Sequence, residues 1–347
     1  MNKKLKVFVT GVTGQDGSYM VDYLLNKYKD IEVYGGVRTV SVENRVNTRG
    51  FSKDPRYTQV RFDLTDSHSV DKAIEDINPD YFINLAAQSF VGDSWDIPAS
   101  TFQINAVGVL NCLESIRRHC PRCKFYNAGT SEEFGDVSYS PQDEDHPLKP
   151  RSPYGASKVS ARMLVKTYRE SYNMFAVQMW LFNHESPRRP DKFVTQKIIK
   201  ALSKGEPVRL GNIYSKRDWS HAKDMVKAIW HVMQQDEPRE YVIGSGETYT
   251  IKDFCNFTLE ELGIFSEGEW RGEGLDEKFC IGEEAIIEID PAFFRPAEVE
   301  LLKADPSKIK KELDWTPEYD IMRLIEDMVN SELNKNRDSK KDSKESN

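Results

Sequence analysis

The chain has 347 residues, of which 39% are hydrophobic and 11% aromatic, and its formal net charge is −8 at neutral pH. This length is enough for one large domain or for two smaller ones with separate cores. The negative charge argues against general nucleic-acid binding. Because the sequence has no run of about eighteen apolar residues, we expect no membrane-spanning helix.

The start of the chain and its cysteines indicate the cellular compartment. A short polar start leads directly into a predicted strand, without the apolar stretch of a secretory signal. The five cysteines are scattered and odd in number, which is typical of reduced thiols. Cys120 and Cys123 form a single CxxC pair without a second pair, so we expect no metal site. We therefore expect a cytoplasmic protein.

Predicted strands and helices alternate along the first half of the chain. Residues 5–10 are predicted to form a buried strand, which leads through a glycine-rich turn into a helix that ends near residue 25. The next predicted elements are strands at 31–37 and 58–63, a helix at 70–77, a strand at 81–85, a helix at 100–118, a strand at 124–128, a helix from 154 to about 171, and a strand at 175–180. This alternation predicts the α/β class, with a Rossmann-like doubly wound parallel sheet.

The pattern becomes less regular after residue 183, where loops are rich in Arg, Pro and Gly. We therefore predict a cofactor-binding Rossmann domain at 1–180, to which segments around 218–245 return. A smaller α/β substrate domain is predicted mainly at 181–333. Residues 334–347 are polar without an apolar face, and we expect a disordered tail there.

A glycine-rich turn follows the first predicted strand and resembles a dinucleotide-binding turn in its spacing. Glycines allow a tight turn and close approach of a pyrophosphate, and the amides of the following helix N-terminus bind phosphate. A turn that is merely well packed would also use glycines, so this motif alone is weak evidence. The residues predicted to contact the cofactor here are Gly11, Thr13, Gly14, Gln15, Asp16 and Gly17.

Later strand ends supply further predicted cofactor contacts. Arg38 follows the second strand, where an acidic residue would bind the ribose of NAD, and its guanidinium instead suits the extra phosphate of NADP. The alternative is a solvated arginine. We expect the adenine to lie against Asp63 and Leu64. The residues after the fourth strand that we expect at the pyrophosphate and nicotinamide ribose are Leu85, Ala86, Ala87, Gln88 and Ser89.

Tyr154 and Lys158 are four residues apart in a predicted helix, so their side chains face the same way. A phenol with a pKa near ~10 is a poor base at neutral pH. A nearby fixed cation, helped by an oxidised nicotinamide ring, favours the phenolate and lowers this pKa. Tyr154 is thus predicted to take the proton from a sugar hydroxyl while a hydride leaves the same carbon. An ordinary surface Tyr and Lys is the alternative, against which the upstream glycine turn argues.

Thr130 and Glu132 lie just beyond the fifth predicted strand, where ligands of such sheets bind. Thr130 is predicted to hydrogen-bond the hydroxyl that is oxidised. Glu132 supplies a second base, which removes the C5 proton beside a ketone formed at C4 and then protonates the departing C6 hydroxyl. A helix-capping or solvated carboxylate is the alternative for Glu132. Its neighbour Glu133 is assigned no role.

These motifs resemble the extended short-chain dehydrogenases/reductases, and specifically the GDP-mannose 4,6-dehydratase family. The resemblance extends to about residue 330. The segments that carry it are Thr10-Gly11, Thr130-Ser131-Glu132, Ser152-Pro153-Tyr154-Gly155, Asn183-His184-Glu185-Ser186-Pro187-Arg188-Arg189, Phe193-Val194-Thr195, Lys216-Arg217-Asp218-Trp219, His221-Ala222-Lys223-Asp224 and Arg295-Pro296-Ala297-Glu298-Val299.

The resemblance implies roles for single residues. Thr130, Glu132 and Tyr154 match the catalytic trio, with Lys158 as the supporting lysine. His184 and Arg189 match residues that contact NADP. The positions that match the GDP-binding residues are Asn183, Lys197, Arg217, Arg295 and Glu298.

The implied activity is conversion of GDP-mannose to GDP-4-keto-6-deoxy-mannose through NADP, by a homodimer or homotetramer. The family usually has two consecutive arginines where this chain has Arg38-Thr39, in a segment that helps neighbouring subunits share the cofactor region, so a homodimer stays open beside the tetramer. Other departures gather at the sugar and nicotinamide end, and dehydration of GDP-manno-heptose therefore stays open. Two further alternatives are a sugar-nucleotide epimerase or reductase, against which Glu132 argues, and a cofactor-binding sensor, against which Tyr154 and Lys158 argue.

Overall fold

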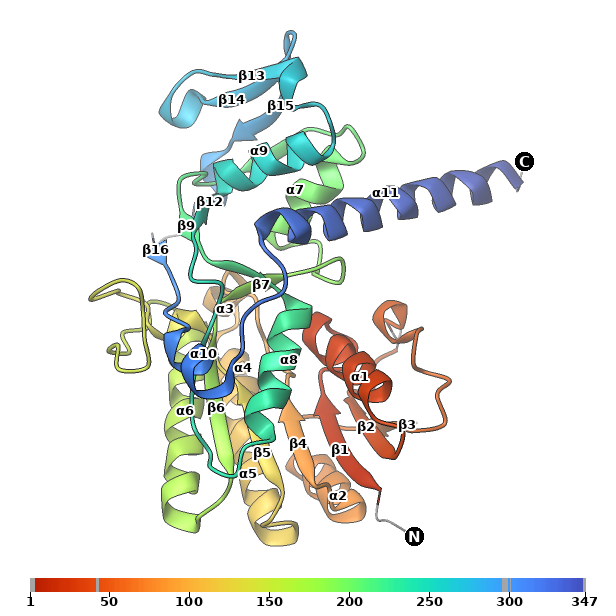
Figure 1. The fold of residues 1–347 in the computed structure, drawn as a ribbon, viewed down its shortest axis with the longest axis vertical. Helices are drawn as coiled ribbons and strands as arrows, with labels where there is room; N and C mark the ends of the chain where they lie inside the picture. Colours follow the sequence, from red (N-terminus) through yellow and green to blue (C-terminus); the bar gives the residue numbers. More distant parts are fainter. Residues whose placement is uncertain (1–3, 42–43, 295–298, 300, 346–347) are drawn as a thin grey trace.

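The computed structural model describes residues 4–41, 44–294, 299 and 301–345. Seven of the described strands form one parallel sheet in the order β11-β6-β5-β4-β1-β2-β3 (Figure 1). These strands are β1 (Leu5–Thr10), β2 (Ile31–Val37), β3 (Tyr57–Arg61), β4 (Tyr81–Asn84), β5 (Lys124–Ala128), β6 (Ala176–Leu181) and β11 (Val242–Ile243). The order reverses between β1 and β4, which is the doubly wound topology predicted from the sequence.

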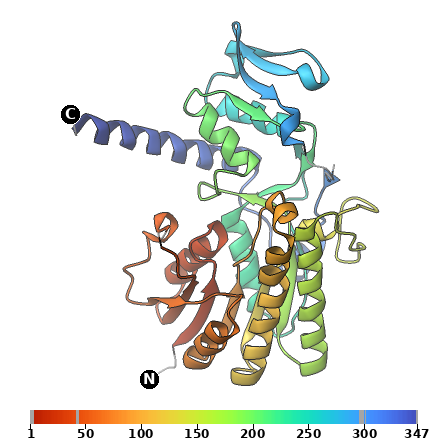
Figure 2. The ribbon, with the colours of Figure 1, turned by 180° about the vertical axis from the view of Figure 1, so that it is seen from behind.

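Helices cover both faces of this sheet. On one face α1 (Gln15–Lys27) and α8 (Ala222–Met233) bury a core that includes Trp230 (Figure 1). On the other face α2 (Ser67–Ile77), α5 (Gly108–His119) and α6 (Pro153–Tyr172) bury a second core around Phe82 and Phe125 (Figure 2). Burial on both faces explains why the central strands contain continuous apolar runs, such as Val7-Phe8-Val9 of β1, rather than strict alternation. The predicted Rossmann-like α/β fold is confirmed.

The helix predicted at 100–118 is interrupted in the structure. It consists of α4 (Pro98–Phe102), a π-helical turn (Gln103–Val107) and α5. The buried side chain of Asn105 within the turn is hydrogen-bonded outside the helix, to the main chain of Gln88 at 2.9 Å. Apolar periodicity does not reveal such a turn, because the pattern of buried residues continues through it.

A second sheet, with strand order β13-β14-β15-β8, lies beyond the carboxyl edge of the first (Figure 1). A separate core joins it to α7, α9 and the start of α11. The elements of this upper part are α7 (Val194–Leu202), β8 (Val208–Leu210), α9 (Ile251–Glu261), β13 (Gly268–Arg271), β14 (Lys278–Ile281), β15 (Glu284–Ile289) and α11 (Ile321–Glu345).

Short strands and connections join the two parts. Asp218 is fully buried, and its carboxylate accepts hydrogen bonds from the amides of Ser245, Gly246 and Ala304 at 2.8 to 3.1 Å. This residue therefore holds three distant segments together. The remaining helices and strands are α3 (Asp93–Asp96), β7 (Asn183–Glu185), β9 (Lys216–Arg217), β10 (Trp219–His221), β12 (Tyr249–Thr250), β16 (Leu301–Leu302) and α10 (Ser307–Leu313).

The end of the chain differs from its prediction. Instead of a disordered segment from residue 334, α11 continues as a helix to Glu345 and extends away from the body (Figure 1). Leu324, Ile325 and Met328 anchor the start of α11 in the upper core. Residues 330–345 contain no glycine or proline, so nothing in them stops the helix. None of the helices in the described residues is long and apolar enough to span a membrane.

Candidate active site

The glycine turn between β1 and α1 lies at the carboxyl edge of the sheet. Gly11 has φ +69°, and a Cβ there would lie 2.9 Å from the main chain of Leu85. A Cβ on Gly17 would lie 2.3 Å from the carbonyl oxygen of Gly11, so both positions require glycine. Gly14 is the N-cap of α1, and no side chain caps this end of the helix. The first amides of α1 are thus left available to an anion, as at an anion-binding helix N-terminus.

Gln15 and Asp16 of this turn contact His184 of β7, a pairing that the sequence arguments had not made. The Gln15 amide donates to the His184 carbonyl oxygen at 3.1 Å, and the Asp16 carboxylate lies 3.0 Å from His184 Nε2. Burial raises the pKa of Asp16, but His184 and Arg189 outweigh it and hold this pKa below its usual value. Burial lowers the pKa of His184, and Asp16 outweighs it, so the net shift is upward. The pair is thereby stabilised in its charged form.

The loop after β4 is fixed from two sides. The amides of Leu85 and Ala86 donate to Thr10 Oγ1 at 3.0 and 2.9 Å, and the amide of Gln88 donates to Asn105. Asn105 also donates to Ser157 Oγ of α6 at 3.1 Å. The π-helical turn therefore joins this loop to the helix that carries Tyr154. Ala87 is half-buried and Ser89 is exposed in the same loop.

The three residues predicted at the adenosine end lie at neighbouring strand ends. Arg38 is exposed and immediately follows β2. Leu64 is buried, and a Cβ at Gly108 would lie only 2.7 Å from Leu64 Cβ. The Asp63 carboxylate accepts from the amide and hydroxyl of Thr65 at 2.9 and 2.8 Å.

Thr130 and Tyr154 meet at the end of β5. Thr130 caps a 3-10 turn (Ser131–Glu133), and its hydroxyl accepts from the Glu132 amide at 3.3 Å. Tyr154 lies in the first turn of α6 and shares a hydrogen bond with the Thr130 hydroxyl. A Cβ on Gly155 would lie 2.7 Å from the Glu132 carbonyl oxygen. The turn that bears Thr130 and half-buried Glu132 is therefore packed directly on the helix that bears Tyr154.

Burial sets the direction of the pKa shifts of Tyr154 and Lys158. Burial raises the pKa of Tyr154, and although the Thr130 hydrogen bond lowers it, the net shift is upward. Lys158 Nζ donates to the Ala128 carbonyl oxygen at 2.8 Å and lies 5.9 Å from the centroid of the Tyr154 ring. Burial lowers the pKa of Lys158 to about 8. The predicted lowering of the phenol pKa depends on the nicotinamide ring as well as on Lys158, so it stays a prediction for the protein with its cofactor bound.

The residues implied at the nucleotide end come from several segments. Asn183 begins β7, and Arg189 lies 2.9 Å from the Glu185 carboxylate. Lys197 of α7 lies with its Nζ 3.8 Å from the centroid of the Phe293 ring. Buried Arg217 is in β9. Arg295 and Glu298 fall outside the described residues.

Sequence reasoning missed Glu133. This residue is fully buried, and its carboxylate accepts from the Thr130 amide at 2.9 Å and from Arg162 Nε at 2.5 Å. The spacing Thr130-x-x-Glu133 is that of a capping box, which is the signal that could have identified it.

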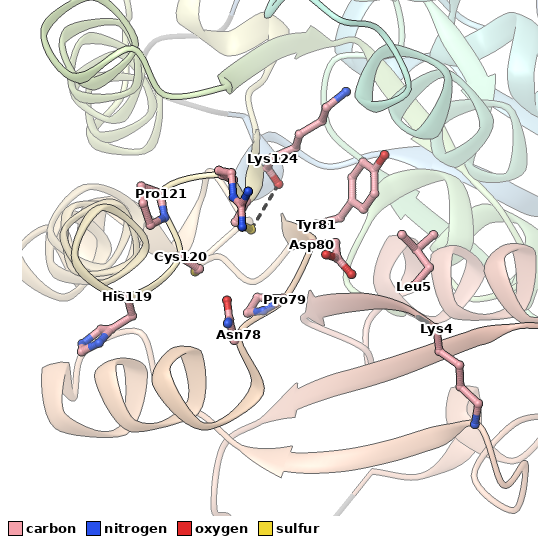
Figure 3. A pocket seen from close by; sticks show the side chains of 12 residues that line it. Lys4, Leu5, Asn78, Pro79, Asp80, Tyr81, His119, Cys120, Pro121 and Lys124 are labelled. Atoms are coloured by element: carbon pink, nitrogen blue, oxygen red, sulfur yellow. Dashed lines mark hydrogen bonds between the residues drawn. The ribbon is translucent and has the colours of Figure 1, made fainter. Parts of the chain in front are cut away.

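A separate hollow of about 610 Å³ lies at the opposite, amino-terminal edge of the sheet (Figure 3). Cys120 and Cys123 are among the residues that line it, together with Asp80 and Lys124. Burial raises the pKa of the Cys123 thiol well above its usual value. A thiol in that state is a poor nucleophile. Because this hollow lies at the opposite edge of the sheet from Thr130 and Tyr154, it is distinct from the candidate active site.

Comparisons with known proteins identify the family of the chain. The family profile described as GDP-mannose 4,6 dehydratase matches residues 8–328. A GDP-mannose 4,6-dehydratase of Vibrio cholerae is 43% identical over 96% of this chain and 94% of its own, and a human GDP-mannose 4,6 dehydratase is 39% identical over 94% and 90%.

Solved structures show the same fold. A dTDP-glucose 4,6-dehydratase of Streptomyces venezuelae with NAD and TYD bound has a TM-score of 0.83 and 22% identity, covering 96% of this chain and 98% of that one. A UDP-glucose 4-epimerase of Thermus thermophilus in complex with NAD has a TM-score of 0.80 and 26% identity, covering 94% and 99%. By its sequence profile, its full-length relatives and its fold, the chain belongs to the GDP-mannose 4,6-dehydratase family.

Proposed function

We propose that this chain dehydrates GDP-mannose to GDP-4-keto-6-deoxy-mannose by an internal hydride transfer. The observation that carries the proposal is the packing of the turn that bears Thr130 and Glu132 on the first turn of α6, which bears Tyr154. This arrangement provides two bases at one site, which dehydration requires and simple hydride transfer does not. The family to which the chain belongs supports the same reaction.

The proposed proton transfers follow from these positions. Thr130 hydrogen-bonds the C4 hydroxyl, and Tyr154 takes its proton. Lys158 supplies the positive charge that supports the phenolate. Glu132 then removes the C5 proton, which the C4 ketone has made acidic, and donates it to the C6 hydroxyl as water departs.

A nicotinamide dinucleotide fits the carboxyl edge of the sheet. When bound, it supplies the hydride acceptor for C4 and the donor for C6. The crowded glycines of the turn and the amides of α1 would hold its pyrophosphate. The remaining residues proposed to line the cofactor are Thr13, Gln15, Asp16, Asp63, Leu64, Leu85, Ala86, Ala87, Gln88, Ser89, His184 and Arg189.

Exposed Arg38 at the end of β2 supports NADP as the cofactor. Replacement of Arg38 by alanine is expected to weaken NADP binding about tenfold, since a charge-assisted bond to the 2′-phosphate is lost. NAD binding should be unchanged, because NAD lacks that phosphate. Calorimetric titration of both cofactors measures the two affinities. Equal weakening for NADP and NAD, or no weakening for either, would contradict this assignment.

We place the GDP group in the upper part of the molecule. Lys197 and Arg217 carry the positive charge needed for a diphosphate, and the resemblance adds Asn183, Arg295 and Glu298. The corresponding division is a cofactor domain at 1–180 with a returning segment around 218–245, and a nucleotide-sugar domain mainly at 181–333. The placement of α8 and β11 in the body of the first sheet supports it.

A homodimer, or a homotetramer built from such dimers, is supported by apolar side chains exposed on adjoining segments. Phe102 of α4, Val107 of the π-helical turn and Met163 of α6 are 37%, 38% and 45% exposed. Replacement of Met163 by glutamate is expected to shift the protein to monomer, since a charge would be desolvated in the interface. Light scattering after size-exclusion chromatography measures the mass. A mass unchanged from the wild type, or a wild type that is already monomeric, would count against this face.

The function is tested with GDP-mannose and GDP-manno-heptose, each incubated with the protein and catalytic amounts of NADP. Mass spectrometry should show loss of one water from GDP-mannose without net reduction of the cofactor. Loss of water from the heptose alone would keep the mechanism and change the substrate. If neither mass changes while NADP is bound, the proposed dehydration is wrong.

A further inference from the structure

The buried carboxylate of Glu133 lies beneath the proposed catalytic turn. Its Oε1 accepts hydrogen bonds from the Thr130 amide at 2.9 Å and from Gln178 Nε2 at 3.0 Å, and its Oε2 accepts from Arg162 Nε at 2.5 Å. Glu133 and Arg162 have side-chain exposures of 0% and 3%. Two ionic groups removed from water to this extent are costly unless each is well bonded.

The main chain of the turn rests on this ion pair. A Cβ on Gly129 would lie 2.7 Å from Glu133 Oε1 and 2.9 Å from Arg162 Nη2. Gly129 directly precedes Thr130, so the ion pair packs against the main chain between the end of β5 and the start of the 3-10 turn. Arg162 is held in turn by the Gln178 carbonyl oxygen at 2.7 Å and by the Trp180 ring, whose centroid is 3.5 Å from Arg162 Cζ.

A line of buried polar side chains connects Glu133 to the glycine turn. From Gln178 it passes through Asn127 and Asn84 to Thr10, with donor–acceptor distances of 2.6, 2.7 and 2.6 Å. Thr10 Oγ1 then accepts from the amides of the loop after β4. Four neighbouring strands, β6, β5, β4 and β1, are thereby fixed relative to one another at their carboxyl ends.

Gln178 Nε2 donates both to Glu133 Oε1 and to the Lys158 carbonyl oxygen, each at 3.0 Å, so the Glu133 carboxylate lies close to Lys158. We propose that Glu133, a residue outside the catalytic set, is a positioning residue that holds Thr130 and Glu132 in place against α6 and provides a fixed negative charge near Lys158. This inference rests on the proposed roles of Thr130, Tyr154 and Lys158. Its first consequence is geometric, because without the Glu133 carboxylate the Thr130 amide loses its acceptor. Its second consequence is electrostatic and concerns the pKa values of Lys158 and Tyr154.

The charged groups that act on Lys158 come from two other elements, Glu133 from the 3-10 turn and Asp16 from α1. Burial lowers the pKa of Lys158 to about 8, and both carboxylates oppose this effect. Glu133 also acts on Tyr154, whose pKa burial, Glu132 and Glu133 raise and Thr130 and Arg189 lower. Loss of the Glu133 charge should therefore lower the pKa of Lys158 and of Tyr154 together.

A lowering of both pKa values together is a signature that a purely structural residue would not produce. The proposed reactive form is the Tyr154 phenolate beside the Lys158 ammonium, so the rate should rise with pH until these two groups together have lost one proton and should then level off. In Glu133→Gln the pH at which the rate levels off should fall by roughly 1 pH unit. The maximal kcat should fall about tenfold with little change in KM, because positioning in the transition state is lost while binding is kept.

A matched control is Glu277→Gln, at the position directly before β14. Glu277 is buried and bonded to Lys252 at 2.5 Å, but it lies outside the proposed site. Its replacement should lower the unfolding temperature but should not change the pH at which the rate levels off. If Glu133→Gln does not fold, the double variant Glu133→Leu/Arg162→Leu removes both charges and avoids an unpaired one. It should fold and still show a lower kcat.

A measurement independent of turnover separates this inference from the proposed function. Competitive labelling with acetic anhydride over a pH series, with peptides identified by mass spectrometry, reports the titration of Lys158 itself. A titration at lower pH in Glu133→Gln than in the wild type is expected, whether or not GDP-mannose is the substrate. Identical Lys158 titrations, or a double variant as active as the wild type, would overturn the inference. A wild type that removes no water would refute only the proposed function.

Discussion

Replacement of Glu132 by glutamine should lower the rate of water loss by ~10²–10⁴-fold, the usual contribution of a positioned proton-transfer group. Glutamine keeps the shape of the side chain and its place in the turn, but it cannot accept the C5 proton. Oxidation at C4 does not involve this carboxylate. Reduced nicotinamide should therefore accumulate when Glu132→Gln is mixed with GDP-mannose, which absorbance follows.

Cofactor affinity should be unchanged in Glu132→Gln, since the glycine turn and α1 are untouched. Asp136→Asn is a suitable control, because Asp136 is an exposed carboxylate four residues further along the same loop. That variant should keep full activity. Water loss at the wild-type rate in Glu132→Gln would remove Glu132 from the mechanism and favour an epimerase or reductase.

Replacement of Tyr154 by phenylalanine should stop the reaction one step earlier. The variant loses a single oxygen from a buried ring, and with it the group that accepts the C4 proton. We expect kcat to fall by ~10²–10⁴-fold, and reduced nicotinamide should not accumulate. The contrast with Glu132→Gln assigns the two bases to separate steps.

The pH dependence gives a second test of Tyr154. Because burial raises the pKa of Tyr154, the phenolate is a minor species at neutral pH and the wild-type rate should rise with pH. The residual rate of Tyr154→Phe should lack this rise. Tyr168→Phe on the same helix is the control, since that buried phenol bonds Glu114 at 2.5 Å away from the site. It should lower stability but not kcat. A Tyr154→Phe variant with a normal pH profile would exclude the phenol as base.

Much of the fold was predictable because its signals are local. Apolar runs separated by amphipathic helices defined the strands of the parallel sheet up to β6, and the crowding at Gly11 and Gly17 explains why the turn needs those glycines. Boundaries were less predictable. The predicted start of α2 at residue 70 missed its first turn, which begins at Ser67 because Asp66 caps it.

The family was also evident in the sequence, because the motifs around Thr130, Tyr154 and His184 lie in order along one chain, and the profile and the relatives confirm it. What the sequence left open was which residues touch. Asp16 meets His184, 168 residues away, and Glu133 meets Gln178, 45 residues away. No local period encodes such contacts.

The pKa shifts of the site depend on tertiary structure. From the sequence, a lysine one helical turn from Tyr154, together with an oxidised nicotinamide ring, is expected to lower the pKa of the phenol, and this stays a prediction for the protein with its cofactor bound. The folded chain buries both groups, and desolvation, which depends on every surrounding atom, raises the pKa of Tyr154 and lowers that of Lys158 to about 8. The sequence by itself determined the α/β fold, the family and the candidate residues, since these depend on local pattern and order. Burial and long-range contacts, which exist only once the chain has folded, set the direction of the pKa shifts of Tyr154 and Lys158 and brought Glu133 beneath the turn.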